Sequence, residues 1–342
     1  MKMCSKERKN YDLVDLCKFI ACIFIVCIHT AAFSDLIEEG YYYLESCVFR
    51  IAVPFFFIAS GFFFGKKLVQ TNENKGLLFS YIKRLGVPLA FWEVINVVIE
   101  ILKQLLIKKV PAAKVVRNVF QSIMFYPYGA LWYVQALLIA LLLVTYVYRK
   151  GWLKECILMS MGLYLIGLLG NSYYFLIFGT KFQWIVDKYL SVFVSTRNAL
   201  FVALYFVSAG VWIAVHKTKT GGGKWRVIVL YGVYILETAL IKNCQSADDK
   251  SMFISLIALI PALFTVTANS NLEVKCAKML RSYSTGIYFM HKAVIHIWLL
   301  CFAVVGLEVK PTVEFFLVFA SCFIICSVAY RVDNKCINML IK

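Results

Sequence analysis

Two ionisable side chains, Lys18 and His29, stand in the first apolar stretch of the sequence, which runs from Leu16 to Phe33. An imidazole titrates near neutral pH, so it is suited to accepting or donating a proton. Ionisable groups are costly inside a membrane span and normally face the interior of the helix bundle or a wet cavity. The pair therefore marks the first candidate site for chemistry.

The spacing places both side chains on one face of a helix. They are eleven positions apart, which corresponds to three turns plus about 20° and to roughly 16 Å along the axis. Two structural alternatives stay open. Lys18 lies about one turn from the end of the span, where a lysine paired with Asp15 can extend its amine to the interface. A neutral His29 bonded to a neighbouring helix is the alternative for the histidine.

The elements that position this pair are membrane helices. The chain has 342 residues, of which 61% are hydrophobic and 16% charged, whereas soluble domains have about 25% charged and 45–50% apolar residues. Several stretches reach the roughly 18 apolar residues that cross a bilayer as a helix. The first of them exceeds the ~7–15 residues of a signal-peptide core, which predicts a retained first helix. We therefore predict an all-α polytopic membrane protein.

Hydropathy predicts about ten transmembrane helices. Their approximate ranges are 14–34, 48–65, 86–105, 131–148, 153–170, 199–215, 227–242, 252–268, 284–304 and 312–330. With the N-terminus in the cytoplasm, the inner loops and ends hold 22 Lys and Arg and the outer loops hold 9. The positive-inside rule then places the N- and C-termini in the cytoplasm.

Other sequence features point to no additional site. The net charge of +17 is distributed over short loops and forms no long basic arm, which argues against nucleic acid as a partner. Of the twelve cysteines, half lie in apolar runs without a zinc-type spacing, so we expect buried thiols and no metal site. The glycine-rich stretch Thr220–Lys224 lacks the spacing of a phosphate-binding loop and is interpreted as a turn.

Longer segments resemble a known family. The run "YDLVDLCKFIACIFIVCIHT", followed by "FRIAVPFFFIASGFFFG", resembles the start of the acyltransferase-3 family of integral-membrane acyltransferases. The hallmark of that family is a basic residue, ten intervening residues and a histidine, which Lys18 and His29 match. The segments "LWYVQALLIALLL" and "STGIYFMHKAVI" resemble its fourth and penultimate helices. The resemblance covers nearly the whole chain and implies a single transmembrane domain over residues 1–342.

Within the family, "STRNALFVALYFVSAG" and "IYFMHKAVI" are most similar to the membrane domain of vancomycin-resistance membrane serine racemases. Those proteins carry a pyridoxal-phosphate racemase domain after the last helix. The sequence ends at Lys342, so we expect that domain to be absent. The RxxR motif of the family is incomplete here, because "IKRLGVP" offers Lys83 and Arg84 without a second arginine three residues later.

The resemblance implies transfer of a short acyl group, acetyl, from acyl-CoA to a hydroxyl of an envelope or exported glycan, or of a small hydroxylated acceptor. It implies no permanently bound cofactor, and a multi-pass location in the bilayer of the bacterial inner membrane. Acyl transfer to a hydroxyl needs a base, which is the role expected for His29. Lys18 is expected to hold the donor or tune the field of the site. Lys83 and Arg84 would receive the donor phosphates, or would be solvated topology charges.

Three further residues are candidates for substrate binding. Arg50 opens the second span close in depth to His29, so it can bind a carboxylate or a developing oxyanion, or anchor the helix at the interface. Arg197 heads the sixth span as a substrate contact or as an interfacial cap. His291 lies deep in the ninth span as a second functional histidine. His216 and His296 are interpreted as structural.

Four charged residues in or near the spans have simpler explanations. Glu93 and Glu237 lie in the third and seventh spans, where one of them is expected to neutralise a basic partner inside the bundle. Glu100 and Lys103 are three positions apart, which predicts a local ion pair. A second function from a different class stays open, namely a transport module for a small polar substrate such as serine. It rests on the likeness to the serine racemases and on the incomplete RxxR motif.

Overall fold

The computed structural model describes residues 10–71, 74–217, 223–247, 250–332, 334, 337, 339 and 340. Residues 220–222 of the glycine-rich turn lie outside the described residues. The α-helices are α1 (Asp12–Thr30), α2 (Tyr41–Tyr43), α3 (Ala52–Gln70), α4 (Asn74–Leu102), α5 (Ala112–Met124), α6 (Trp132–Arg149), α7 (Leu153–Leu168), α8 (Lys181–Phe193), α9 (Leu204–His216), α10 (Gly223–Leu240), α11 (Leu256–Asn269), α12 (Ala277–Val305) and α13 (Pro311–Val332). Four shorter turns of π or 3-10 helix are η1 (Leu44–Phe49), η2 (Lys103–Ile107), η3 (Tyr174–Leu176) and η4 (Ala199–Ala203).

Each of the ten segments predicted to span the membrane coincides with a helix. Among the described residues, seven helical segments are long and apolar enough to cross a bilayer; they contain α1, α3, α4, α6, α9, α12 and α13. The other three helices are weaker candidates. With 16 and 14 residues, α7 and α11 are shorter than the roughly 20 residues that a span needs, and α10 carries three charged side chains. The protein is therefore an all-helical, multi-pass membrane protein, and the number ten stays a prediction.

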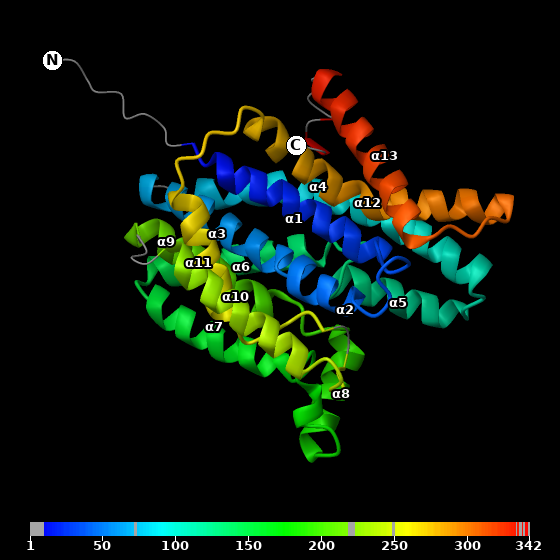
Figure 1. The fold of residues 1–342 in the computed structure, drawn as a ribbon, viewed down its shortest axis with the longest axis horizontal. Helices are drawn as coiled ribbons and strands as arrows, with labels where there is room; N and C mark the ends of the chain where they lie inside the picture. The colour runs from blue at the N-terminus through cyan, green and yellow to red at the C-terminus, as the bar shows by residue number, and fades with distance from the viewer. Residues whose placement is uncertain are drawn as a thin grey trace.

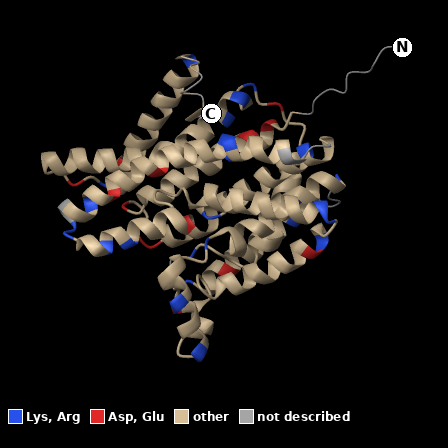
Figure 2. Ribbon diagram, turned by 180° about the vertical axis from the view of Figure 1, so that it is seen from behind, with Lys and Arg blue, Asp and Glu red and all other residues tan. Residues whose placement is uncertain are grey.

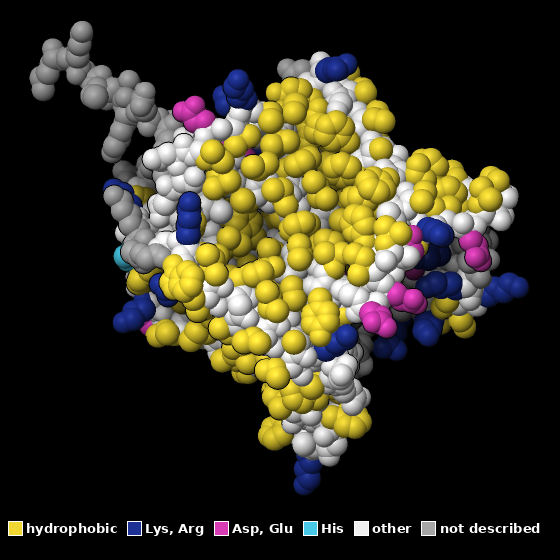
Figure 3. All heavy atoms as spheres, in the orientation of Figure 1, with side chains coloured by type: hydrophobic (Ala, Val, Ile, Leu, Met, Phe, Trp, Pro, Cys, Tyr) yellow, Lys and Arg dark blue, Asp and Glu magenta, His cyan; other side chains and the backbone are white. Residues whose placement is uncertain are grey.

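The long helices run side by side as one bundle, and α8 projects from it (Figure 1). Lys and Arg lie mainly near the two ends of the long helices and on α8, which leaves the middle of the bundle largely uncharged (Figure 2). In the space-filling view a broad hydrophobic face fills the middle, with charged side chains toward its left and right margins (Figure 3). This distribution is typical of a protein surrounded by lipid.

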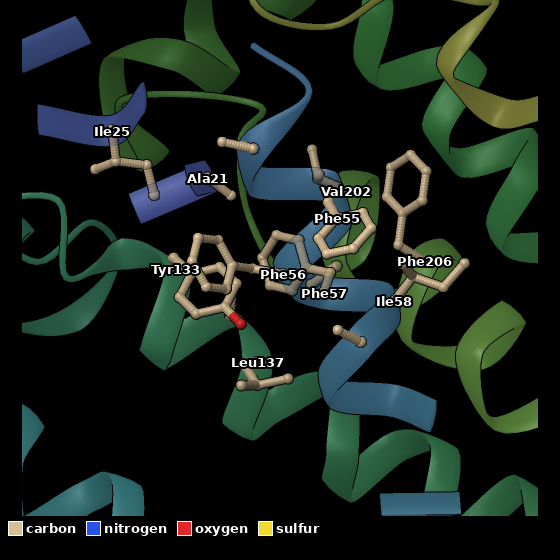
Figure 4. Packing of buried hydrophobic residues seen from close by; sticks show 14 of the residues in the cluster. Ala21, Ile25, Phe55, Phe56, Phe57, Ile58, Tyr133, Leu137, Val202 and Phe206 are labelled. Carbon is tan, nitrogen blue, oxygen red and sulfur yellow. The ribbon is translucent and has the colours of Figure 1, made fainter. Parts of the chain in front are cut away.

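The centre of the bundle is the contact between α3 and α9. Gly61 and Gly65 of the sequence "GFFFG" face α9, and a β-carbon on Gly65 would lie 2.9 Å from the Val211 Cα atom. A β-carbon on Gly210 of α9 would lie 2.7 Å from the Phe62 backbone nitrogen. Such approach requires glycine on both helices, as in small-residue motifs of membrane helices. Phenylalanines of α3 fill the space on either side, toward Tyr133 of α6 and toward α9 (Figure 4).

The cysteines of the apolar runs have different environments. Cys22, Cys27, Cys322 and Cys326 are buried, Cys17 is half-buried and Cys301 is exposed. The prediction of buried thiols is thus confirmed for four of the six, and it is wrong for Cys301, which lies on the outside of α12. A hydropathic run identifies a span but does not say which side of the helix faces the bundle.

The two long segments that connect predicted spans, residues 106–130 and 171–198, contain amphipathic helices. Helix α5 buries only Val115 and Ser122, and α8 has no buried residue. On α8 the side chains of Phe182, Trp184 and Ile185 are exposed. This places the aromatic segment 171–198 partly outside the bundle, where large amphipathic side chains are typical of a membrane interface.

Candidate active site

His29 is fixed by the end of α1. The helix stops because Ala31 adopts the left-handed conformation, with φ of 50°, and the Ala32 N–H bonds to the Cys27 carbonyl at 2.9 Å. His29 thus stands in the last turn, half-buried. Its ring stacks on the ring of His291 from α12, with centroids 5.2 Å apart and planes inclined by 29°. The stack joins the first helix to a helix more than 250 residues later in the chain.

The hydrogen bonds of His291 indicate which ring nitrogen carries its proton. Its Nδ1 atom lies 2.7 Å from the Tyr288 carbonyl and 3.2 Å from the Ile287 carbonyl. Because carbonyl oxygens only accept, Nδ1 carries the proton and Nε2 has an open lone pair. Among the described residues Nε2 has no hydrogen-bond partner, although His291 is fully buried. His291 supports His29 from behind and does not line any of the three cavities described below.

His29 faces a cavity of about 310 Å³, here called the His29 cavity. Arg50 and Arg197 also line it. Arg50 is paired with Glu45 at 2.5 Å. The Arg197 guanidinium carbon lies 5.7 Å from the ring centroids of both Tyr126 and Trp132, and its Nε donates to the Ser195 Oγ at 3.3 Å. Two arginines and a histidine from three different segments of the chain therefore line one cavity.

A second and larger hollow, of about 620 Å³, adjoins the first and shares His29 and Arg197 with it. We call it the vestibule. Amide side chains line it, and Asn118 of α5 donates to Gln104 at 2.7 Å. Gln104 in turn donates to the Glu100 carboxylate at 3.3 Å. Lys292, the neighbour of His291, also lines the vestibule.

Lys18 faces a separate cavity of about 420 Å³, the Lys18 cavity, at the end of the bundle where α1 and α12 begin. Its lining includes five basic residues from four helices: Lys18, Lys67, Arg84, Lys278 and Arg281. Tyr81 holds two of them, since Lys67 and Arg84 lie 5.0 and 4.5 Å from its ring centroid. Of the residues described there, Asp15 is the one acidic side chain.

Asp15 pairs with Arg281 and not with Lys18. Arg281 donates to both carboxylate oxygens, at 2.9 and 2.5 Å. Within the described part of the chain no ion pair joins Asp15 to Lys18 within 4.0 Å. The Lys18 side chain thus lines the cavity without an ion pair to Asp15. Lys83 is exposed and lies outside the lining, whereas its neighbour Arg84 is part of it.

The Lys18 cavity and the His29 cavity meet at two tyrosines, Tyr133 of α6 and Tyr288 of α12, which line both. Their ring centroids are 5.5 Å apart in an edge-to-face arrangement. The site therefore has a basic end, a histidine and arginine end, and an aromatic contact between the two.

Comparison with known proteins identifies the family. The family profile described as "Acyltransferase domain" (acyltransferase 3) matches residues 11–331. The chain belongs to the acyltransferase-3 family. It is an acyltransferase, and the resemblance in its first two spans is confirmed over nearly the whole chain.

The curated relatives of this acyltransferase are racemases. An "Amino-acid racemase" of Enterococcus faecalis is 26% identical over 76% of this chain and 36% of its own length. A "Serine/alanine racemase" of Enterococcus gallinarum is 26% identical over 73% of this chain and 36% of its own length. A second "Amino-acid racemase" of Enterococcus faecalis is 24% identical over 96% and 47%, respectively. The chain thus spans between a third and a half of these relatives. No solved structure gives a significant match.

Sequence reasoning missed several residues that line the three cavities of the candidate site. The sequence analysis counted Lys278 and Arg281 only among the basic residues of an inner loop. Their position at the start of α12 was the signal that could have identified them. Tyr133 and Tyr288 carried no signal, because aromatic residues are common in membrane helices. Lys292 was also missed, and its charge next to His291 was the available indication.

Glu93 is buried and Glu237 half-buried, and both have a role other than the predicted one. Glu93 accepts the Ser122 hydroxyl at 3.3 Å and the Tyr128 N–H at 3.2 Å. Glu237 accepts the N–H groups of Ile254 and Ser255, at 2.6 and 2.8 Å, at the start of α11. The expectation that one of them neutralises a basic partner is wrong in the described part of the chain, where both carboxylates accept hydrogen bonds from uncharged N–H and hydroxyl groups and neither forms an ion pair. The pair Glu100–Lys103 is confirmed at 3.5 Å.

Proposed function

We propose that this acyltransferase moves an acetyl group from acetyl-CoA to a hydroxyl of an envelope or exported glycan in a bacterial cell membrane. Both chain termini lie in the cytoplasm in this proposal, with ten helices in the membrane, so the Lys18 cavity opens to the cytoplasm. The observation that carries it is the meeting of the basic Lys18 cavity and the His29 cavity at Tyr133 and Tyr288. Donor and acceptor can then approach the site from opposite sides.

The donor end fits the charge of CoA. Acyl-CoA is made in the cytoplasm and carries phosphates, and phosphates bind to clustered Lys and Arg side chains. Arg84 and Lys67 flank one tyrosine ring, and Lys18 lies deeper along α1. The thioester must reach from there to His29, which is roughly 16 Å away along the helix axis. Lys83 would contribute only a long-range attraction, since it is exposed.

The acceptor end fits general-base chemistry. His29 takes the proton from the acceptor hydroxyl, whose oxygen forms a bond to the thioester carbonyl carbon. The carbon–sulfur bond then breaks, and the departing thiolate takes a proton from the imidazolium. Arg197 and Arg50 line the same cavity and supply positive charge to the oxyanion of the tetrahedral intermediate. His291 keeps the His29 ring in place by stacking against it.

The vestibule supports a polyhydroxylated acceptor. It is larger than the His29 cavity, opens beside it, and presents amide side chains of Gln104, Asn118 and Gln121. Amides both donate and accept hydrogen bonds, which suits hydroxyl groups. Trp132 and Tyr126 add a stacked aromatic pair, with planes inclined by 9°.

A second candidate function is transport of a small polar substrate such as serine. The paired Arg50 and Glu45 give the His29 cavity one positive and one negative group side by side. That pair is complementary to the carboxylate and ammonium of an amino acid. The names of the relatives, amino-acid and serine/alanine racemases, indicate the same class of substrate.

The test uses the full chain purified into proteoliposomes. CoA release from acetyl-CoA is measured with and without polysaccharide or cell-wall acceptor, for the wild type and for His29→Ala. Removal of a general base is expected to lower the turnover number by roughly 10²- to 10⁴-fold. The matched control is His216→Ala, since His216 is exposed at the end of α9 and lines none of the three cavities.

Two results decide between the candidates. Acceptor-dependent CoA release that is lost in His29→Ala and kept in His216→Ala supports acetyl transfer. Uptake of labelled serine into the same vesicles, without any CoA release, refutes it in favour of transport.

A further inference from the structure

We propose that Tyr133 and Tyr288 select the acyl group by length: they form an aromatic septum that admits an acetyl thioester and excludes longer acyl chains. The inference rests on the proposed function, because it needs a donor bound in the Lys18 cavity. The residues concerned are not the proposed base, nor the proposed donor or oxyanion groups.

The two tyrosines lie where the Lys18 cavity and the His29 cavity meet. Of the described residues that line the Lys18 cavity and the His29 cavity, Tyr133 and Tyr288 are the two common to both. Both side chains are buried, with 8% and 7% exposure. The acyl carbonyl must come within about 3–3.5 Å of the attacking oxygen to react. Along the described lining of the two cavities, a donor whose phosphates stay in the Lys18 cavity therefore reaches His29 past these two rings.

Hydrogen bonds and ring contacts fix the two tyrosine rings in place. The Tyr133 hydroxyl lies 3.1 Å from the Ser60 Oγ, on the side of the Lys18 cavity. The Tyr288 hydroxyl donates to the Ala130 carbonyl at 2.5 Å, on the side of the His29 cavity. The Tyr133 ring also packs on Phe57, with centroids 4.4 Å apart (Figure 4). Each tyrosine is thus fixed in one orientation by a ring contact and one hydrogen bond.

The space beyond the two rings, on the side of His29, is small. The His29 cavity measures about 310 Å³ and has to hold the acceptor hydroxyl as well as the acyl tail. Buried, closely packed rings do not yield an extra methylene without strain. An acetyl group has no methylene beyond the carbonyl carbon and its methyl. Each further carbon must either displace a ring or take space from the acceptor.

The test measures chain-length profiles of the full chain in proteoliposomes. Values of kcat/KM are determined with acetyl-, propionyl-, butyryl- and hexanoyl-CoA for the wild type, Tyr133→Ala, Tyr288→Ala and Tyr133→Phe. Each alanine variant is expected to raise the ratio of butyryl to acetyl transfer at least tenfold. Tyr133→Phe keeps the ring and should stay within twofold of the wild type. Tyr146→Ala is the matched control, because Tyr146 is exposed on the same helix, α6.

A measurement on the wild type keeps the inference testable even where an alanine variant does not fold. If the septum selects, longer donors bind in the Lys18 cavity about as well as acetyl-CoA and differ in kcat. Selection that resides wholly in KM would overturn the inference. So would alanine variants that transfer acetyl groups with an unchanged chain-length profile. A wild type that releases no CoA from acetyl-CoA with any acceptor would instead refute the proposed function.

Discussion

Replacement of Gly61 by alanine tests the contact between α3 and α9. A β-carbon at this position would lie 2.9 Å from the Cα atom and the carbonyl carbon of Val207, and nearer still to its carbonyl oxygen. Carbon atoms in favourable contact are about 3.5–4.0 Å apart, so the two helices would have to separate by roughly 0.6–1 Å. Because the obstructing atoms belong to the backbone of a helix, no side-chain rotation relieves the clash.

The expected cost follows from two opposing effects. Overpacking of a close-packed core costs about 1–3 kcal/mol, and a clash with backbone belongs at the upper end of that range. Alanine gains about 1 kcal/mol over glycine in the interior of a helix. The net loss of stability is therefore about 2 kcal/mol. For a chain of 342 residues, that corresponds to a fall of roughly 3 °C in the melting midpoint.

The assay is thermal unfolding of the purified protein in detergent, followed by intrinsic tryptophan fluorescence. Gly232→Ala in α10 is the matched control, because a β-carbon there meets no atom within 4 Å. Gly210→Ala should reproduce the effect from the opposite helix. The reasoning is refuted if the Gly61→Ala and Gly232→Ala proteins melt within 1 °C of each other.

Three further predictions concern charged groups. The hydrogen bond from Thr312 holds the pKa of Asp35 below its usual value, so this contact stabilises the fold above the ordinary carboxyl pKa of ~3.9 and its contribution is lost as the pH falls through the lowered pKa. Part of the fall in melting midpoint between pH 5 and pH 3 should therefore be absent in Asp35→Asn, and a pH profile identical to that of the wild type would contradict this. Arg281→Met should destabilise the fold by about 3 kcal/mol in thermal unfolding, because it leaves the Asp15 carboxylate, which is 1% exposed, without its partner; this is the low end of ~3–5 kcal/mol, since Arg281 itself is half-exposed. Arg281→Lys should recover part of the loss, and equal melting midpoints for the Met variant and the wild type would exclude the pair as a stabilising contact. Lys18→Met should raise the KM for acetyl-CoA about tenfold, the loss of one charge-assisted hydrogen bond, with a smaller change in kcat; an unchanged KM would remove Lys18 from the donor site.

The first helix was the part of the site that the sequence predicted best. Helical spacing placed Lys18 and His29 on one face, and the structure gives each of them a cavity. The positions of the helices were also predictable, because long apolar runs are a strong signal. Whether α7, α10 and α11 cross the membrane was less predictable, since short or charged helices are stabilised by neighbours that hydropathy does not see.

Partners across the bundle could not be predicted. The sequence offered Lys18 as a partner for Asp15, only three positions away, whereas the structure supplies Arg281. Tyr133 and Tyr288 become neighbours only when α6 and α12 pack together. A single sequence contains the helical period but not the contacts between helices. The arrangement of Tyr133 and Tyr288 between the cavities could therefore not be predicted from it.

The pairing of α1 with α12 has a consequence for biosynthesis. The Asp15–Arg281 ion pair joins residues 266 positions apart, and the stack of His29 on His291 spans a similar distance. During translation α1 enters the membrane long before α12 has left the ribosome. For most of that time Asp15 and His29 lie in the first helix without the partners that satisfy them in the finished protein. The stack of His29 on His291 is thus among the last contacts to form. A chain interrupted before α12 contains every residue of the first helix but no assembled candidate site.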